Sequence, residues 1–363
     1  MSTIKKVQDF LSTHNIDAAL VTNPDNIFYL TKFRSDPHER LLGVVIFKDH
    51  NPFIICPYME VEDVKAIGWT HDIIGYKDTD NAFEFLDQAI TERVPTFSLL
   101  AIEKEHLTVD RFEILQERFP ALLFATLDNE LATYRLIKDV AELDFLRKAA
   151  ELADYAIEIG CSEIAEGKTE LEIVQAVEQA VKQKGAEKMS FDTIIISGKK
   201  TASPHGIPSN RAIEKGDFIL FDLGVVYKGY CSDITRTIAF GEPTEEKRKI
   251  YDTVQRAQQA AIDVVRPGTL AKEVDLAARS VIEEAGYGEL FPHRIGHGLG
   301  ISVHEYPSLT ATNTLPLKEG MVFTIEPGIY DPNITGVRIE DDVVVTKNGV
   351  EVLTKYPKDL KIV

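Results

Sequence analysis

The chain has 363 residues, of which 44% are hydrophobic and 27% are charged, a globular composition whose length predicts two domains. Its 40 Lys and Arg residues are outnumbered by 58 Asp and Glu residues, so the formal charge is −18. Such an acidic chain lacks the positive footprint that binding to nucleic acid or to anionic membranes requires, and we expect neither partner. The excess carboxylates are instead suited to metal ions.

The cysteines Cys56, Cys161 and Cys231 lie far apart and form no CxxC pair, which argues against a cysteine-rich zinc site. Their low, odd number is typical of a reducing compartment. No apolar signal-peptide core follows the first residues, and no apolar run is long enough to span a bilayer. We therefore expect a soluble, cytoplasmic protein.

Short apolar strands alternate with amphipathic helices over the first third of the chain. The expected helices are residues 6–15, 60–67, 82–90 and 109–119. The expected strands are residues 18–21, 43–47, 52–56, 73–76 and 97–102. This alternation predicts an α/β domain, which we place at residues 1–130.

The rest of the chain shows a helix pair followed by strands, and then the same pattern again. The expected helices are residues 139–164, 170–184, 245–265 and 271–285, the last two followed by the helix-stopping Gly268 and Gly286. The expected strands are residues 191–197, 218–227, 230–240, 322–330, 337–346 and 350–354. The pattern predicts a duplicated α+β domain over residues 131–363, although no direct sequence repeat is visible.

Two aspartates are placed symmetrically around a possible hairpin turn. If Tyr227 and Lys228 form that turn, Asp222 and Asp233 lie directly opposite each other, with Cβ atoms about 4.5–5.5 Å apart. Apolar neighbours keep the pair away from water, and like charges there need a compensating divalent cation. The alternative is two exposed strand aspartates.

Other metal-binding side chains occur further along the chain. His297 lies among glycines, with His304 close behind, and imidazole is a common metal ligand. Glu326 and Glu340 each lie within a strongly apolar strand, where an acidic residue needs a partner or a metal. A shared site with four carboxylates suits two divalent ions, and favours Mn²⁺ or Co²⁺ over a sulfur-rich zinc centre.

Together these segments resemble the metallopeptidase family of the pita-bread fold, which includes methionine aminopeptidase, aminopeptidase P, prolidase and creatinase. The matching segments are residues 205–208, 222–237, 296–305, 324–330 and 336–342. The resemblance implies two divalent metal ions per subunit, foremost Mn²⁺, with Co²⁺ or Zn²⁺ as alternatives. It implies five ligands: Asp222, Asp233, His297, Glu326 and Glu340. Since all five are present, the metal-independent creatinase is disfavoured.

The N-terminal α/β domain distinguishes the chain from bare methionine aminopeptidases and is similar to the domain that precedes the catalytic domain in prolidases and aminopeptidases P. The expected fold class is therefore α+β, a pita-bread catalytic domain after a smaller creatinase-like domain. The compact length is similar to that of bacterial prolidases. This resemblance implies an Xaa-Pro dipeptidase that cleaves the bond before a C-terminal proline with a metal-bridged hydroxide.

Two other functions stay open. An aminopeptidase P-like enzyme would act on longer peptides with proline in the second position. A metal-free binding module on the same fold is disfavoured by the complete ligand set.

The resemblance also implies roles for residues around the metals. Glu326 would accept and shuttle a proton, His304 would stabilise the developing oxyanion, and His205 would contact the substrate. A dipeptide's carboxylate needs a cation, for which Arg338 and Arg294 are both candidates. Arg338 could instead be structural, holding Glu340 or a carboxylate of the N-terminal domain.

The segment Asp36-Pro37-His38-Glu39-Arg40 is a charged loop that resembles one in bacterial prolidases. The resemblance implies a homodimer in which this loop helps to cover the partner's site. The alternative is a solvated turn.

Overall fold

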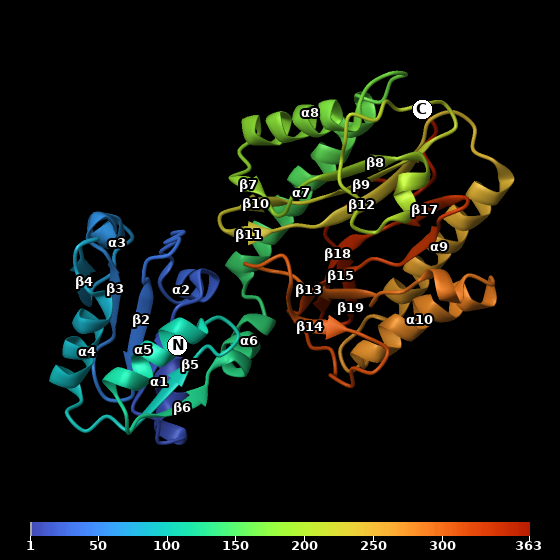
Figure 1. Cartoon of the computed structure of the whole chain (residues 1–363). Helices are drawn as coiled ribbons and strands as arrows, with labels where there is room; N and C mark the ends of the chain where they lie inside the picture. The colour runs from blue at the N-terminus through green and yellow to red at the C-terminus, as the bar shows by residue number, and fades with distance from the viewer. Residues whose placement is uncertain (1) are drawn as a thin grey trace. The chain divides into compact units, whose positions relative to one another are not determined.

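The computed structural model describes residues 2–363, which divide into two compact units, residues 2–135 and 136–363 (Figure 1). The sequence places the domain boundary at 130/131, within what the structure shows to be one helix, α6 (Asp128–Leu136). That helix crosses the expected boundary because Leu131 is buried in the core of the N-terminal unit. Among residues 2–363, no helix combines the length and apolar character needed to cross a membrane.

The N-terminal unit is built on one mixed sheet of six strands in the order β4-β3-β2-β1-β5-β6. β1 pairs antiparallel with β2 and parallel with β5, so it lies in the centre of the sheet. Its alternate residues enter two different cores, Ala19 and Val21 on one face and Ala18 and Leu20 on the other. The strands are β1 (Ala18–Val21), β2 (Gly43–Phe47), β3 (Phe53–Pro57), β4 (Asp72–Tyr76), β5 (Leu99–Ile102) and β6 (Leu123–Thr126).

Helices cover both faces of this sheet, which explains why its central strands are buried throughout. Leu11 of α1 and Leu30 of α2 pack in one core, and Leu86 of α4 and Leu115 of α5 pack in the other. Neither α2 nor β6 is among the elements expected from the sequence. The helices are α1 (Thr3–Thr13), α2 (Pro24–Thr31), α3 (Val61–Ala66), α4 (Ala82–Arg93) and α5 (Val109–Arg118), with a 3₁₀ turn η1 (Tyr58–Glu60).

The first half of the C-terminal unit packs a helix pair against two three-stranded sheets, β11-β10-β7 and β12-β9-β8. Both helices, α7 (Val140–Ser162) and α8 (Glu170–Gln183), begin at a capping box. Their apolar faces meet the inner strands around Phe221. The strands are β7 (Lys188–Met189), β8 (Ile194–Ser197), β9 (Phe218–Leu223), β10 (Val225–Tyr227), β11 (Tyr230–Cys231) and β12 (Ile234–Ala239), with η2 (Gly198–Ala202) after β8.

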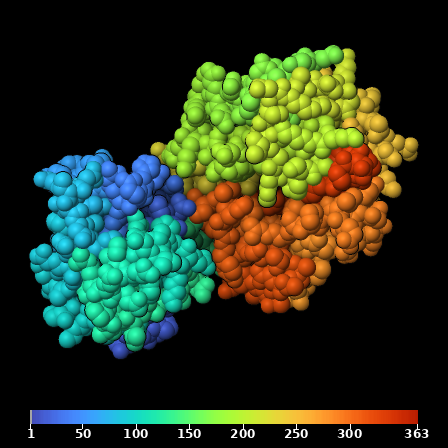
Figure 2. Space-filling model, in the orientation of Figure 1, coloured from blue at the N-terminus to red at the C-terminus, as the bar shows by residue number. Residues whose placement is uncertain are grey.

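The second half repeats this arrangement with helices α9 (Glu245–Val264) and α10 (Ala271–Glu284) against a five-stranded sheet in the order β14-β13-β15-β18-β19 and a β16-β17 pair. The duplicated α+β pattern expected from the sequence is therefore present. Figure 2 shows the green-yellow and orange-red parts of this unit meeting along a seam. The remaining elements are η3 (Gly288–Leu290), β13 (Gly296–Gly298), β14 (Glu305–Leu309), β15 (Val322–Ile325), β16 (Gly328–Asp331), β17 (Thr335–Arg338), β18 (Asp341–Thr346) and β19 (Gly349–Val352).

A buried arginine joins the two halves of the C-terminal unit. Arg236 on β12 is 1% exposed, and its guanidinium donates to the backbone carbonyl of Glu340 at 2.5 Å and to Asp341 at 2.7 Å. The bonds fix β12 of the first half beside β18 of the second. The acidic residues on both sides of this junction are thereby brought to one place.

Candidate metal centre

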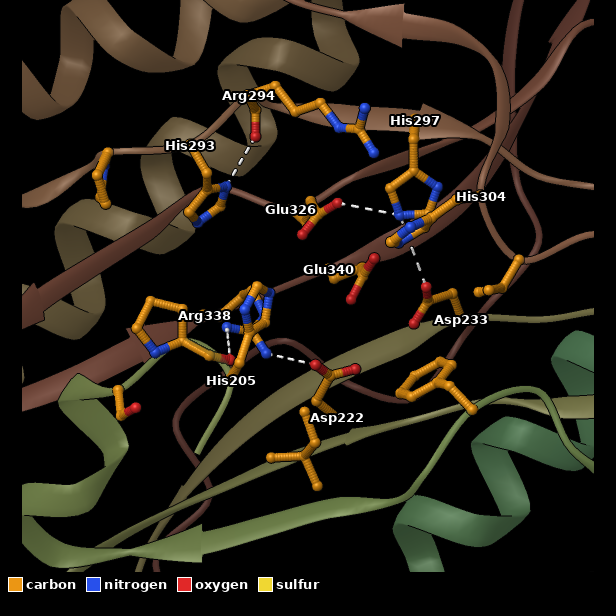
Figure 3. Close-up of a pocket in the computed structure, with 16 residues that line it drawn as sticks. His205, Asp222, Asp233, His293, Arg294, His297, His304, Glu326, Arg338 and Glu340 are labelled. Atoms are coloured by element: carbon orange, nitrogen blue, oxygen red, sulfur yellow. Dashed lines mark hydrogen bonds and ion pairs between the residues drawn. The ribbon is translucent and has the colours of Figure 1, made fainter. Parts of the chain in front are cut away.

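A cavity of about 640 Å³ lies where the two halves of the C-terminal unit meet. All the site residues expected from the sequence line it, together with Arg294 and one further histidine, His293 (Figure 3). We call it the central pocket. Its charged and imidazole side chains are His205, Asp222, Asp233, His293, Arg294, His297, His304, Glu326, Arg338 and Glu340.

The predicted register of the aspartate hairpin was wrong. Tyr227 pairs with Tyr230, and Asp222 on β9 pairs with Thr235, not with Asp233. The turn residues are Lys228 and Gly229, whose φ angles of 50° and 80° are those of a two-residue type I′ turn. The turn centre is thus one residue later than expected, and Asp233 lies between β11 and β12. Both carboxylates nevertheless line the central pocket.

Gly224 is required at the break between β9 and β10. A Cβ atom built on it would lie 1.8 Å from the carbonyl oxygen of Ser232, next to Asp233. Only glycine allows the two strands to approach this closely beside the site.

Three of the expected ligands form one tight cluster. One donor atom each from Asp233, His297 and Glu340 lies within 4.8 Å of the others, and all three side chains are buried. Asp233 Oδ1 is buried without a hydrogen-bond partner among residues 2–363. Burial, reinforced by neighbouring carboxylates, raises the pKa of Asp233 and of Glu340 well above their ordinary values. A buried carboxylate that lacks a protein donor fits a divalent cation.

The imidazole of His297 is oriented by its backbone environment. Its Nδ1 lies 3.1 Å from the carbonyl oxygen of Gly298, which can only accept, so Nδ1 carries the proton. Nε2 then faces the carboxylates, 3.3 Å from Glu326 Oε1 and 3.8 Å from Asp233 Oδ2. A histidine held in this way can give Nε2 to a metal in place of its interaction with Glu326.

The Asp222 carboxylate is paired within the protein. Its Oδ2 accepts from Arg338, which also donates to Thr235 Oγ1 at 3.1 Å and to Tyr330 Oη at 2.9 Å. A longer bond of 3.4 Å runs from Arg338 to the carbonyl of Pro204. Burial raises the pKa of Asp222, and the positive charge of Arg338 opposes that rise. The guanidinium of Arg338 is therefore occupied inside the fold.

A hydrogen-bond chain continues from Arg338 to His293, a histidine outside the set expected from the sequence. Nδ1 of His293 lies 2.8 Å from the carbonyl oxygen of Arg294, so it is the donor. Burial lowers the pKa of His293, and its neutral Nε2 accepts from the Tyr330 hydroxyl at 2.8 Å. Tyr330 in turn accepts from Arg338. The chain links Asp222 to the backbone at Arg294.

Glu326 and His304 lie beside the cluster. Burial alone would raise the pKa of Glu326, but its hydrogen bond and charge interaction with His297 lower it to about 2. The ring of His304 lies 4.0 Å from the ring of His297. His304 keeps contact with solvent, yet partial desolvation and nearby positive groups lower its pKa to about 4. At neutral pH Glu326 is an acceptor and His304 is a neutral imidazole.

Two further residues support the cluster and were also missed. Thr235 donates to Glu340 Oε2 at 2.6 Å, and the backbone N–H of Asp233 donates to Asp342 Oδ2 at 2.9 Å. Asp342 is the buried second residue of the apolar strand β18, which Glu340 directly precedes, so the same sequence signal could have identified it. Thr235 carried no such signal, because threonine is common in strands.

The family follows from matches to two family models. Residues 144–347 match metallopeptidase family M24, and residues 3–137 match the Creatinase/Prolidase N-terminal domain. The chain belongs to metallopeptidase family M24, and its C-terminal unit is a pita-bread catalytic domain preceded by a creatinase-type α/β domain. The resemblance drawn from the sequence motifs is thereby confirmed.

Relatives match the chain over its whole length. An uncharacterized peptidase of Staphylococcus aureus is 49% identical over 358 residues, covering 99% of this chain and all of the relative. The crystal structure of the prolidase from Pyrococcus horikoshii has a TM-score of 0.91 and 39% identity, and covers 98% of this chain and 99% of that one. An X-Pro aminopeptidase from Thermotoga maritima has a TM-score of 0.86 and 32% identity, and covers 96% and 98%.

Proposed function

We propose that the protein is a metal-dependent Xaa-Pro dipeptidase, a prolidase. The observation that carries the proposal is the central pocket, where four carboxylates and a histidine converge with one carboxylate oxygen, Asp233 Oδ1, unpaired among residues 2–363. The likeness to a prolidase over nearly the full length supports the dipeptidase assignment.

The ligands in this proposal are those expected from the sequence. Asp222, Asp233, His297, Glu326 and Glu340 would hold two divalent ions per subunit, foremost Mn²⁺, with Co²⁺ and Zn²⁺ as alternatives. When bound, such ions polarise the substrate carbonyl and lower the pKa of a coordinated water.

The protein's own side chains supply the remaining chemistry. Glu326, an anion at the edge of the cluster, accepts a proton from the attacking water and passes it to the departing nitrogen. His304 is neutral and can donate one N–H to the oxygen that gains charge in the transition state. His205 contacts the substrate from the opposite half of the unit. Arg338 fixes the position of Asp222 and does not contact the substrate.

The wall of the central pocket suits proline. Proline brings an apolar ring and no N–H, so its site needs contact surface and no acceptor for an amide hydrogen. The lining residues without charge are largely apolar: Phe191, Ile194, Pro204, Pro292 and Val303. These residues offer a surface for the ring from both halves of the unit.

An Xaa-Pro aminopeptidase is the second candidate, because an X-Pro aminopeptidase is also similar to nearly the whole chain. A metal-free binding module is disfavoured, because it would leave the buried Asp233 Oδ1 without a partner among residues 2–363.

A substrate panel separates these functions. Purified protein is treated with chelator, reloaded with Mn²⁺, Co²⁺ or Zn²⁺, and assayed on Leu-Pro, Leu-Ala and Arg-Pro-Pro at equal concentration. We expect metal-dependent hydrolysis in which Leu-Pro is cleaved much faster than Leu-Ala or Arg-Pro-Pro. Faster hydrolysis of Arg-Pro-Pro would favour the aminopeptidase, and no metal binding would leave only the binding module.

We also propose that the protein is a homodimer in which the Asp36–Arg40 loop helps to cover the partner's site, as the family resemblance implies. Within its own unit the loop is held at one end, because Arg40 pairs with Asp78 at 2.8 Å and Arg111 donates to the Arg40 carbonyl at 2.9 Å. Asp36 and His38 stay exposed, and those side chains are available to another subunit.

A further inference from the structure

The central pocket contains two arginines that differ in how many of their N–H donors are hydrogen-bonded within the protein. Arg338 is 3% exposed and donates to Asp222, Thr235 and Tyr330. Arg294 is half-buried, and its one side-chain bond among residues 2–363 runs from Nη1 to Ser308 Oγ at 3.0 Å. A guanidinium has five N–H donors, so most of those on Arg294 have no protein acceptor.

Ser308 places this guanidinium close to the metal cluster. Ser308 on β14 pairs directly with His297 on β13, so their side chains lie on one face of the sheet. Figure 3 shows Arg294 extended along the edge of the pocket with its guanidinium directed towards His297.

The position of Arg294 limits what it can bind. An extended residue adds about 3.3–3.6 Å to a chain, so a group one residue beyond the scissile bond stays near the metal cluster. In a dipeptide that group is the terminal carboxylate, whose two oxygens match the planar fork of a guanidinium. In a longer peptide the same place holds an uncharged amide.

We propose that Arg294 binds the α-carboxylate of the substrate's last residue and so selects dipeptides over longer peptides. The inference rests on the proposed peptidase function and assigns its length selectivity to one side chain. Ser308 positions the guanidinium and is not itself a substrate contact. The competing view is that Arg294 is a structural arginine that holds β14 through Ser308.

The test compares Leu-Pro with Leu-Pro-amide, which differ only in the charge at the carboxyl end. Wild-type enzyme should prefer the acid. In Arg294→Met, kcat/KM for the acid should fall about 10- to 100-fold, the value of a hydrogen bond to a charged group, while the amide changes by less than about threefold. Arg294→Lys should restore part of the preference, and Arg266→Met, at an exposed arginine, serves as the matched control. Equal losses for acid and amide would establish the structural role instead.

A binding measurement keeps this test independent of turnover. The reduced-bond analogue of Leu-Pro, which cannot be hydrolysed, is titrated as acid and as amide into metal-loaded enzyme by calorimetry. Tighter binding of the acid that disappears in Arg294→Met supports the assignment, even if no Xaa-Pro peptide is cleaved and the proposed function fails. Equal affinity of wild-type enzyme for acid and amide would overturn the assignment, whatever peptides the enzyme cleaves.

Discussion

The carboxylates on the two sides of the central pocket differ in the partners that the protein gives them. On the Asp222 side, Arg338, Tyr330 and His293 form a closed hydrogen-bond chain that supplies a cation. On the Asp233 side, Asp233, His297 and Glu340 crowd together, and Asp233 Oδ1 has no partner among residues 2–363. The fold supplies a cation to Asp222 and no partner to Asp233 Oδ1. We infer that a ligand from outside the protein, a metal ion, binds Asp233.

Replacing Asp233 should give the largest effect. Asp233→Asn should abolish metal binding and hydrolysis, yet the metal-free variant should be as stable as wild type or more so, because Asn is neutral where burial and neighbouring carboxylates disfavour a charged Asp233. A relief of about 1 kcal/mol would raise the melting temperature of a unit this size by about 2–4 °C. Calorimetry of both proteins after chelation measures this. Retained Mn²⁺-dependent turnover, or a lower melting temperature without metal, would contradict the assignment.

Removing Arg338 should have the opposite effect on stability. Arg338→Met leaves Asp222 buried without its cation, and breaking such a pair costs about 3–5 kcal/mol. Denaturant unfolding of the metal-free protein should show this loss, whereas Arg266→Met at an exposed site should unfold like wild type. An Arg338→Met variant of normal stability would mean that Asp222 is not held by this pair.

Removing His304 should reduce catalysis without affecting the metals. His304→Ala should retain the full metal content and lose about 10²–10³-fold in kcat, the scale for one oxyanion donor. Metal analysis and steady-state kinetics on Leu-Pro measure the two properties, with exposed His14→Ala as control. Lost metal stoichiometry would make His304 a ligand.

The smallest effect is expected from the N-terminal loop. Replacing Asp36, His38, Glu39 and Arg40 with Gly and Ser should raise KM for dipeptides about two- to fivefold, the value of exposed charges at the rim of a site, with metal content unchanged. Replacing the exposed Asp49 and His50 should have no such effect. A fully active monomer in light scattering would show that the loop acts, if at all, only within its own chain.

Much of this arrangement could be predicted from the sequence, because the ligands lie in short segments with strong local patterns. The apolar runs around Glu326 and Glu340 predict buried acids, and the alternating helices and strands predict both units. The missed helix α2 begins at Pro24 after the capping residue Asn23, whose side chain accepts from two backbone N–H groups. An Asn-Pro pair also marks turns, so the sequence alone leaves both readings open.

Features that depend on tertiary contacts could not be predicted. The turn lies one residue later than the symmetric placing of the two aspartates suggests. Asp222 therefore pairs with Thr235 and not with Asp233. From the sequence, Arg294 and Arg338 were equally good candidates to bind the substrate carboxylate. Only the folded structure shows which of the two has its N–H donors already bonded within the protein. Their difference comes from Thr235 and Tyr330, which lie far from each other in the sequence and meet at Arg338.

We expect metal to complete the Asp233 side of the pocket. Calorimetric titration of chelator-treated wild-type protein with Mn²⁺ tests this directly, with Asp233→Asn measured in parallel and the bound metal counted by elemental analysis. Wild type should bind two ions per chain, rise in melting temperature and gain hydrolytic activity, while the variant should do none of these. Equal binding by the two proteins, or no binding by wild type, would contradict this expectation.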